Sequence, residues 1–150
     1  MKTMQTLDES VAMSMDGGEG TAIVPFLPYI LQDAWEIGTD PGVVVDLVRR
    51  HWKHGSSPRV LDLGCGKGAV SVRLAMELGC LCLGIDAIGE FVSAAEAKAR
   101  EFAVESRCRF ERGDIRLRIR ELGRFDVIVL GAIGPVFGDH RETLGILEPH

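Results

Sequence analysis

A glycine-rich turn between an apolar run and an expected helix carries the strongest chemical signal in the sequence. The turn spans residues 64–68, Gly-Cys-Gly-Lys-Gly, and Asp62 stands two positions before it. Glycine allows a sharp turn and lets a ligand approach the main chain closely. The start of the following helix offers free N–H groups and the positive end of the helix dipole. The pattern therefore predicts a ligand-binding loop.

Two further acidic residues follow apolar runs in the same way. Asp86 ends the run that comes after the glycine turn, and Asp114 follows the next one. The carboxyl ends of parallel strands meet at one edge of a sheet, where open α/β sheets bind ligands. An acidic residue in the position of Asp86 can accept hydrogen bonds from ribose hydroxyls. A carboxylate at Asp114 can accept one from an adenine amine. We therefore expect a nucleoside at this edge.

Two classes of nucleoside cofactor fit this arrangement. Gly64, Gly66 and Ala69 match a dinucleotide-binding pattern, with Asp86 near the distance that pattern requires. Asp62 argues against a dinucleotide, because a carboxylate beside a pyrophosphate of about two negative charges is repelled. S-adenosylmethionine (SAM) carries a sulfonium and an ammonium cation and is attracted instead. The residues favour SAM, and a NAD(P)-binding oxidoreductase domain stays as an alternative.

The elements that must position these residues alternate along the chain. Short apolar runs predict strands, and runs with helical spacing predict helices between them. A continuous apolar strand pattern of this kind indicates a mostly parallel sheet with helices on both faces, an α/β fold. The run at 125–130 is the most apolar and is expected to be central, whereas 108–111 is expected at an edge. The strands are expected at 59–63, 81–85, 108–111 and 125–130, and the helices at 25–35, from 41, 69–78, 89–105, 115–122 and 139–147.

These motifs together resemble the class I SAM-dependent methyltransferases, which have a Rossmann-like, doubly wound sheet. The run 60–68 is similar to the first motif of that family, and 83–86 to its ribose-binding strand end. Residues 113–115 are similar to its adenine-contacting segment, and 125–130 resembles its fourth strand. The resemblance covers roughly residues 58–148.

The resemblance implies a role for each matching residue. Asp62, Gly64 and Gly66 would line the methionyl part of SAM, and Asp86 would hold the ribose hydroxyls. Ala87 and Ile88 would lie on the adenine face, Asp114 would reach the adenine amine, the Ile115 N–H a ring nitrogen, and Gly131 would border the methyl group. No metal is expected. The full set of expected cofactor-binding residues is Asp62, Gly64, Cys65, Gly66, Gly68, Asp86, Ala87, Ile88, Asp114, Ile115 and Gly131.

The chain divides into three expected parts. Residues 1–20 are expected to be a mobile tail, 21–57 a helical lid or cap, and 58–150 the cofactor-binding domain. Domains of the family usually have about seven strands, whereas four can be placed here, and residues 147–150 are similar to the turn that leads into a fifth. We therefore expect a domain without its C-terminal strands. The open edge of the fourth strand is an aggregation liability, so we expect a second copy, a partner or the N-terminal segment to cover it.

Methyl transfer is an in-line displacement, for which an enzyme mainly supplies alignment and exclusion of water. A general base depends on the acceptor, and the catalytic residues stay unassigned. Candidates on the acceptor side are Tyr29 and Trp35, with His140 as a candidate base. The alternative interpretations are helix packing for the two aromatic residues and a solvated loop position for the histidine.

Composition narrows the class of partner. The chain has 150 residues, with 17 Lys and Arg against 22 Asp and Glu, a formal charge of −5. This balance disfavours a dedicated nucleic-acid binder. The seven arginines between 107 and 124 could attract an anionic acceptor or RNA, but Glu111, Asp114 and Glu121 balance them, and we interpret the stretch as a solvated face. We expect a small-molecule acceptor, no membrane segment and a cytoplasmic location. The alternative to a methyltransferase within the same family is a non-catalytic SAM-binding or partner-dependent fragment.

Overall fold

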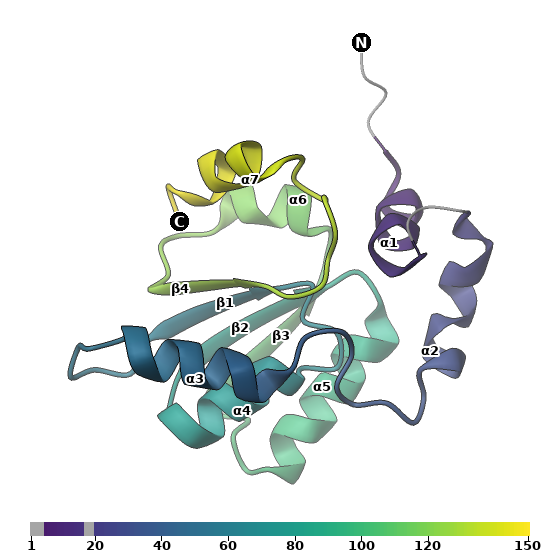
Figure 1. Cartoon of the computed structure of the whole chain (residues 1–150). Helices are drawn as coiled ribbons and strands as arrows, with labels where there is room; N and C mark the ends of the chain where they lie inside the picture. Colours follow the sequence, from purple (N-terminus) through teal and green to yellow (C-terminus); the bar gives the residue numbers. More distant parts are fainter. Residues whose placement is uncertain (1–4, 17–19) are drawn as a thin grey trace.

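A computed structural model describes residues 5–16 and 20–150 of the chain. Its centre is a sheet of four parallel strands in the order β3-β2-β1-β4 (Figure 1). The predicted α/β fold with a parallel, Rossmann-like sheet is confirmed. The strands are β1 (Arg59–Leu63), β2 (Leu81–Asp86), β3 (Cys108–Arg112) and β4 (Val127–Leu130).

The register of the strands brings their carboxyl ends to one edge of the sheet. Leu63 at the end of β1 pairs with Ile85 of β2 and with Leu130 of β4. Asp86 at the end of β2 pairs with Arg112 of β3. The turns that follow all four strands therefore lie next to one another, as a ligand site at this edge requires.

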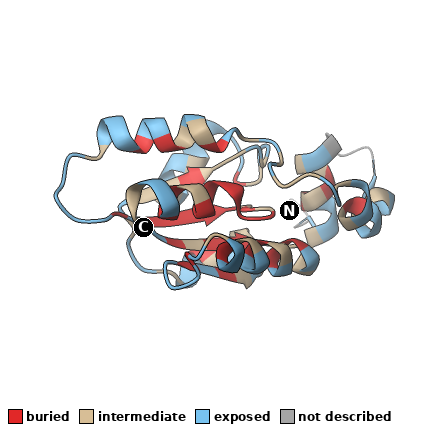
Figure 2. Cartoon of the chain, turned by 90° about the horizontal axis from the view of Figure 1, so that it is seen from below, coloured by how far each residue is buried: buried red, intermediate tan, exposed pale blue. Residues whose placement is uncertain are grey.

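Helices cover both faces of the sheet (Figure 1). One face is covered by α3 (Pro41–His51), α4 (Ala69–Leu78) and α5 (Gly89–Glu101), and the other by α6 (Ile115–Arg118), the short 3-10 helix η2 (Ile119–Glu121) and α7 (His140–Leu147). Figure 2 shows buried residues on the strands and on the helix surfaces that point toward them. Alternate β1 residues serve the two cores: Val60 packs on the α4 side, whereas Leu61 and Leu63 pack on the other.

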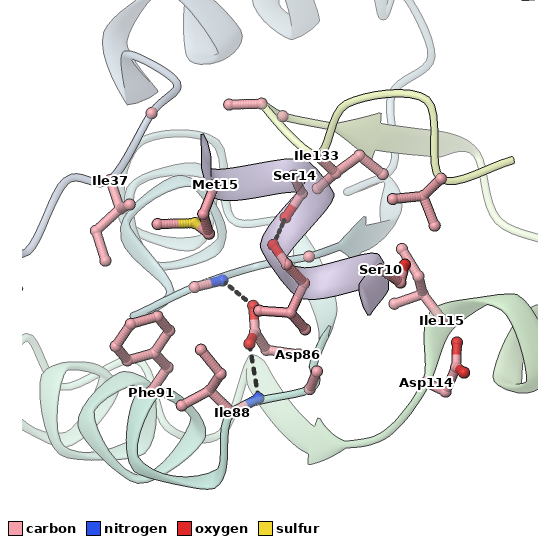
Figure 3. Close-up of a pocket in the computed structure, with 18 of the residues that line it drawn as sticks. Ser10, Ser14, Met15, Ile37, Asp86, Ile88, Phe91, Asp114, Ile115 and Ile133 are labelled. Atoms are coloured by element: carbon pink, nitrogen blue, oxygen red, sulfur yellow. Dashed lines mark hydrogen bonds between the residues drawn. The ribbon is translucent and has the colours of Figure 1, made fainter. Parts of the chain in front are cut away.

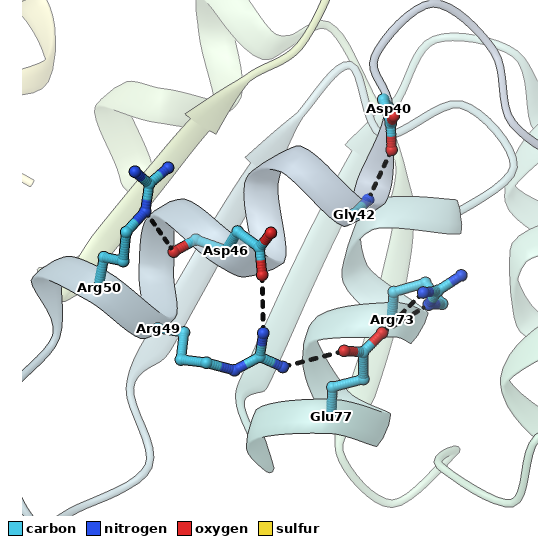
Figure 4. Close-up of polar contacts among 7 residues, drawn as sticks. All are labelled: Asp40, Gly42, Asp46, Arg49, Arg50, Arg73 and Glu77. Atoms are coloured by element: carbon cyan, nitrogen blue, oxygen red, sulfur yellow. Dashed lines mark hydrogen bonds and ion pairs between the residues drawn. The ribbon is translucent and has the colours of Figure 1, made fainter.

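The start of α3 is the one that the sequence predicts. The Asp40 carboxylate accepts a hydrogen bond from the Gly42 N–H at 2.8 Å, and Pro41 occupies the first helical position. Farther along, Arg49 donates to Glu77 of α4 at 3.0 Å (Figure 4). Ion pairs this exposed add little stability, so the burial of Val45 and Val48 holds α3 in place.

The first part of the predicted cap, residues 21–35, is less helical than predicted. It forms a 3-10 helix, η1 (Thr21–Phe26), and one turn of α-helix, α2 (Leu27–Ile30), rather than a helix that continues to Trp35. Pro25 lies inside η1, and Pro28 lies at the start of α2. Proline has no N–H, so Pro28 cannot continue the hydrogen bonding of η1 into α2, and the two short helices stay separate.

β4 lies at an edge of the sheet, so the prediction that it is central is wrong. Its side chains nevertheless pack on both faces, with Val129 in one core and Ile128 and Leu130 against the other. The apolar residues of β4 therefore indicate that both of its faces are covered. They do not indicate whether the strand is central or at an edge. Within the described part of the chain no strand pairs with its outer side, and the N-terminal segment does not cover it as a strand.

The prediction of a tail at the N-terminus is corrected for residues 7–16, which form α1 (Leu7–Asp16). Thr6 and Glu9 cap it reciprocally, since Thr6 N–H donates to the Glu9 carboxylate at 2.7 Å and Glu9 N–H to the Thr6 hydroxyl at 3.2 Å. Ser10 and Ala12 are buried, so this helix packs on the rest of the protein. The parts of the predicted tail at 1–4 and 17–19 lie outside the described residues.

Candidate functional site

A cavity of about 290 Å³ opens at the carboxyl edge of the sheet, beneath α1 (Figure 3). Its floor comes from the turns after β1, β2, β3 and β4, and its cover comes from α1 and from Ile37 and Gly38. Eight of the residues that the sequence predicts for cofactor binding line it: Gly64, Gly66, Asp86, Ala87, Ile88, Asp114, Ile115 and Gly131.

Asp86 is fixed at the cavity by two main-chain hydrogen bonds. One of its oxygens accepts from the Gly66 N–H at 2.8 Å and the other from the Ile88 N–H at 2.9 Å (Figure 3). Burial raises the pKa of Asp86, and these backbone N–H groups oppose the rise. Each carboxylate oxygen keeps further acceptor capacity, so Asp86 can still receive the hydroxyls of a sugar.

Asp114 is held in a different way, as the N-cap of α6. It accepts from the Arg116 N–H at 2.9 Å, and its carboxylate pairs with the Arg116 guanidinium at 2.6 Å. These hydrogen bonds from Arg116 lower the pKa of Asp114. Arg116 also donates to the Gln5 carbonyl at 3.0 Å, which ties the start of α1 to this corner of the cavity.

Asp62 does not line the main cavity. It is buried behind the glycine turn, where the Ser71 hydroxyl donates to its carboxylate at 2.7 Å. Burial raises the pKa of Asp62 to about 6. It borders only a small inner void of about 20 Å³, together with Cys65 and Trp35. The expectation of three carboxylates at the cavity mouth is therefore corrected to two.

The glycines of the turn serve two different purposes. Gly64 has φ +73°, and a Cβ there would stand 2.3 Å from Ile133 Cγ2. Gly66, which lines the cavity, is open, because a Cβ would meet nothing nearer than Ile37 Cδ1 at 4.0 Å. Gly68 faces away from the cavity, and a Cβ there would lie 2.7 Å from the Ala95 Cβ. Gly68 thus allows α4 and α5 to pack closely, and it is not among the residues that line the cavity.

None of the three catalytic candidates lines the cavity. Tyr29 is 73% exposed, and His140 is exposed at the start of α7. Trp35 is held by packing contacts. Its indole N–H donates to the Lys67 carbonyl at 3.0 Å, and its ring stacks on Phe102 with centroids 5.2 Å apart. The helix-packing interpretation fits Trp35, and no catalytic side chain is assigned.

The residues of α1 and of the loop after β4 that cover the cavity are not among those predicted from the sequence. α1 contributes five side chains, and the loop after β4 adds Ile133 and Val136. A signal for α1 is present, because its cavity-lining residues recur at helical spacing along one side. The five are Leu7, Ser10, Val11, Ser14 and Met15.

Comparison with known proteins decides the family. The family described as "Methyltransferase domain" matches residues 54–148, which is more than half of the chain. The chain belongs to the methyltransferase-domain family. Its fold agrees, since a SAM-dependent methyltransferase from Thiobacillus denitrificans, crystallised with S-adenosyl-L-homocysteine, superposes with a TM-score of 0.66 at 20% identity, covering 83% of this chain and 50% of that one.

Two curated relatives each match about half of this methyltransferase-domain chain. A release factor glutamine methyltransferase from Buchnera aphidicola subsp. Baizongia pistaciae (strain Bp) is 34% identical over 76 residues, 49% of this chain and 27% of the relative. A putative methyltransferase from Geobacillus sp. (strain WCH70) is 38% identical over 72 residues, 48% of this chain and 25% of the relative. The chain thus matches about a quarter of the length of each.

Metal-ligand clusters and membrane-spanning helices are both absent from the described residues. No three His, Cys, Asp or Glu side chains among them gather closely enough to hold a metal ion. No helix in residues 5–16 and 20–150 has the length and apolar character needed to cross a membrane.

Proposed function

We propose that this chain binds SAM in the cavity beneath α1 and transfers the methyl group to a small-molecule acceptor. The observation that carries the proposal is Asp86, which is fixed between the Gly66 and Ile88 N–H groups at the cavity. Membership of the methyltransferase-domain family supports the reaction class.

The cavity fits the nucleoside end of such a cofactor. Asp86 would accept the ribose hydroxyls, and Asp114, kept ionised by Arg116, would accept from the adenine amine. Ile88 and Phe91 present apolar surface at the cavity beside Asp86 (Figure 3) and would pack on the adenine ring. The open main chain at Gly66 leaves room for close approach of the ligand.

When bound, SAM would supply a methyl group already activated on a sulfonium. The chain's own contribution is then alignment and dryness. Gly131 and Ile133, at the end of β4, would border the transfer point, and α1 would exclude water with Val11 and Met15. With apolar walls and the two serines of α1, the cover suits a small acceptor of low charge.

The reaction is tested by following a labelled methyl group. The chain is incubated with methyl-labelled SAM and a low-molecular-weight metabolite extract. The proposal expects label in a small molecule and an equal amount of S-adenosylhomocysteine. If the chain forms no more labelled product and S-adenosylhomocysteine than a heat-inactivated control, the transferase assignment is contradicted. Binding of SAM without transfer of the methyl label to any fraction would favour the non-catalytic alternative. Methyl label in protein or RNA would show that the acceptor is a macromolecule and not a small molecule.

We also propose that a second copy of the chain covers the open edge of β4. A groove beside this edge is lined by β4 and by Val44, Leu47 and His51 of α3. Val44 and Leu47 are apolar, so an antiparallel meeting of two α3 helices would pack the apolar stripe of one copy on that of the other. The stripe is therefore complementary to itself in apolar character.

A further inference from the structure

Lys67 lies inside the glycine turn, yet its side chain does not face the ligand cavity. The residue is only 9% exposed. Lysine is rarely buried to this extent unless its ammonium group is paired. The ammonium donates to the main-chain carbonyls of Leu31 and of Gln32, the latter at 3.1 Å. It also lies 5.8 Å from the centroid of the Phe91 ring. A lysine in a glycine-rich turn invites a phosphate-binding interpretation, but this one is directed into the cap.

The main chain of the same residue makes a second tie to the cap. The Lys67 carbonyl accepts from the Trp35 indole N–H at 3.0 Å. Trp35 is in turn stacked on Phe102, and the Lys98 ammonium lies 5.1 Å from the centroid of the indole ring. One residue of the cofactor turn therefore holds the cap segment at two points, through its ammonium at 31–32 and through its carbonyl at 35.

The segment that follows α2 depends on such ties. Residues 31–39 form no regular helix or strand. This segment supplies Ile37 and Gly38 to the wall of the cavity. A Cβ placed on Gly38 would stand 2.6 Å from the Ala132 Cβ, so the segment also meets the loop after β4. The wall therefore spans the space between the glycine turn and the end of β4.

We infer that Lys67 is a positioning residue that fixes the wall formed by Ile37 and Gly38 to the glycine turn, so that the cofactor loop and the acceptor side of the cavity move as one unit. The inference rests on the proposed function for its meaning in methyl transfer. Its structural basis, the two ties to the cap segment, requires no ligand.

The first test is hydrogen exchange of the ligand-free chain, comparing the parent with Lys67→Met, Lys67→Arg and Lys53→Met. Methionine keeps the apolar stem and removes the donor, arginine restores a cationic donor, and Lys53 is an exposed lysine away from the cavity. In Lys67→Met, peptides covering 27–38 should exchange at least about tenfold faster, the size expected for loss of a charged hydrogen bond.

The other two variants should exchange like the parent in 27–38, and peptides of β1 and β2 should not change in any variant. Parent-like exchange of 27–38 in Lys67→Met would overturn the inference. Equal acceleration along the whole chain would also overturn it, because that result means general destabilisation.

The second test adds S-adenosylhomocysteine and follows Trp35. Replacing Trp52 by Phe leaves Trp35 as the single tryptophan of the chain. Ligand should shift Trp35 emission and slow exchange of 27–38 in the parent, and Lys67→Met should abolish both responses while the ligand still binds. Equal responses in Lys67→Met would overturn the inference. A parent that fails to bind the ligand would contradict the proposed function, and the ligand-free comparison would then decide the role of Lys67.

Discussion

The carboxylate of Asp86 bridges the glycine turn and the end of β2, because it accepts from the Gly66 N–H at 2.8 Å and from the Ile88 N–H at 2.9 Å. One side chain thus sets the shape of the loop and faces the cavity as an acceptor. The proposed binding of SAM depends on this double role.

Asp86→Ala should weaken binding of S-adenosylhomocysteine by more than about tenfold, since hydrogen bonds to charged groups contribute about 1.5–3 kcal/mol each. Isothermal calorimetry measures the effect. Asp46→Ala, an exposed carboxylate on α3, is the matched control and should bind like the parent. An unchanged affinity in Asp86→Ala would remove this residue from the site.

Asp62 predicts a pH dependence of stability. Its pKa in the folded chain is about 6, above the ordinary 3.8, because of burial. The folded state therefore holds the proton more tightly than the unfolded state, and stability falls as the pH rises from about 4 through about 6, by about 2–3 kcal/mol. Asp62→Asn keeps an acceptor for Ser71 and should lose this fall.

The comparison uses urea unfolding of the parent and Asp62→Asn at pH 4.5 and pH 7.5. Asp86 and Asp114 are present in both proteins, and the charge of Asp86 contributes to the raised pKa of Asp62, so the difference between the two proteins reports Asp62 together with its coupling to Asp86. The free energy of unfolding of Asp62→Asn minus that of the parent should be larger at pH 7.5 than at pH 4.5. The same difference at both pH values would show that Asp62 does not titrate in this range.

Gly64→Ala should destabilise the chain by about 1–3 kcal/mol, since it forces a side chain into a left-handed conformation. The new Cβ would also stand 2.3 Å from Ile133 Cγ2. Gly55→Ala is the control, because a Cβ there meets nothing within 4 Å. Thermal unfolding compares the two variants. Combining Gly64→Ala with Ile133→Ala should recover only the part due to the contact, and full recovery would refute the conformational explanation.

Ile128→Pro tests pairing through the open edge of β4. The Leu81 N–H donates to the Pro58 carbonyl and the Gly64 N–H to the Ile85 carbonyl, so the even-numbered residues of β1 bond β2 and the odd-numbered residues face β4. Since Val127 lies opposite Val60, the Val127 N–H points toward β1 and the Ile128 N–H points outward, where proline is tolerated. Sedimentation should show a dimer for the parent and for Ile128→Ala, and a monomer for Ile128→Pro. A monomeric parent, or a dimeric proline variant, would contradict pairing through this edge.

The sequence predicts local features of this chain better than their tertiary setting. β1 and α4 have the predicted bounds, because a short apolar run and a glycine-terminated helix are encoded locally. Eight predicted site residues line the cavity for a related reason: the carboxyl ends of parallel strands must meet.

The errors have tertiary causes. α1 was not predicted, although its cavity-lining residues recur at helical spacing, because the burial of that side of the helix depends on distant loops. Asp62 was expected in the cavity, but it alternates with Leu61 and Leu63 and faces α4 and Ser71. This alternation of side chains can be read from the strand pattern, so the sequence does contain a signal that Asp62 is buried on the α4 side. The edge position of β4 has no such signal, since apolarity does not encode strand order.

The most direct measurement is calorimetric titration of the chain with S-adenosylhomocysteine and, separately, with NAD. We expect saturable binding of S-adenosylhomocysteine at one site per chain and no binding of NAD at the same concentrations. Saturable binding of NAD with no binding of S-adenosylhomocysteine would contradict this expectation and would move this cavity to the dinucleotide class.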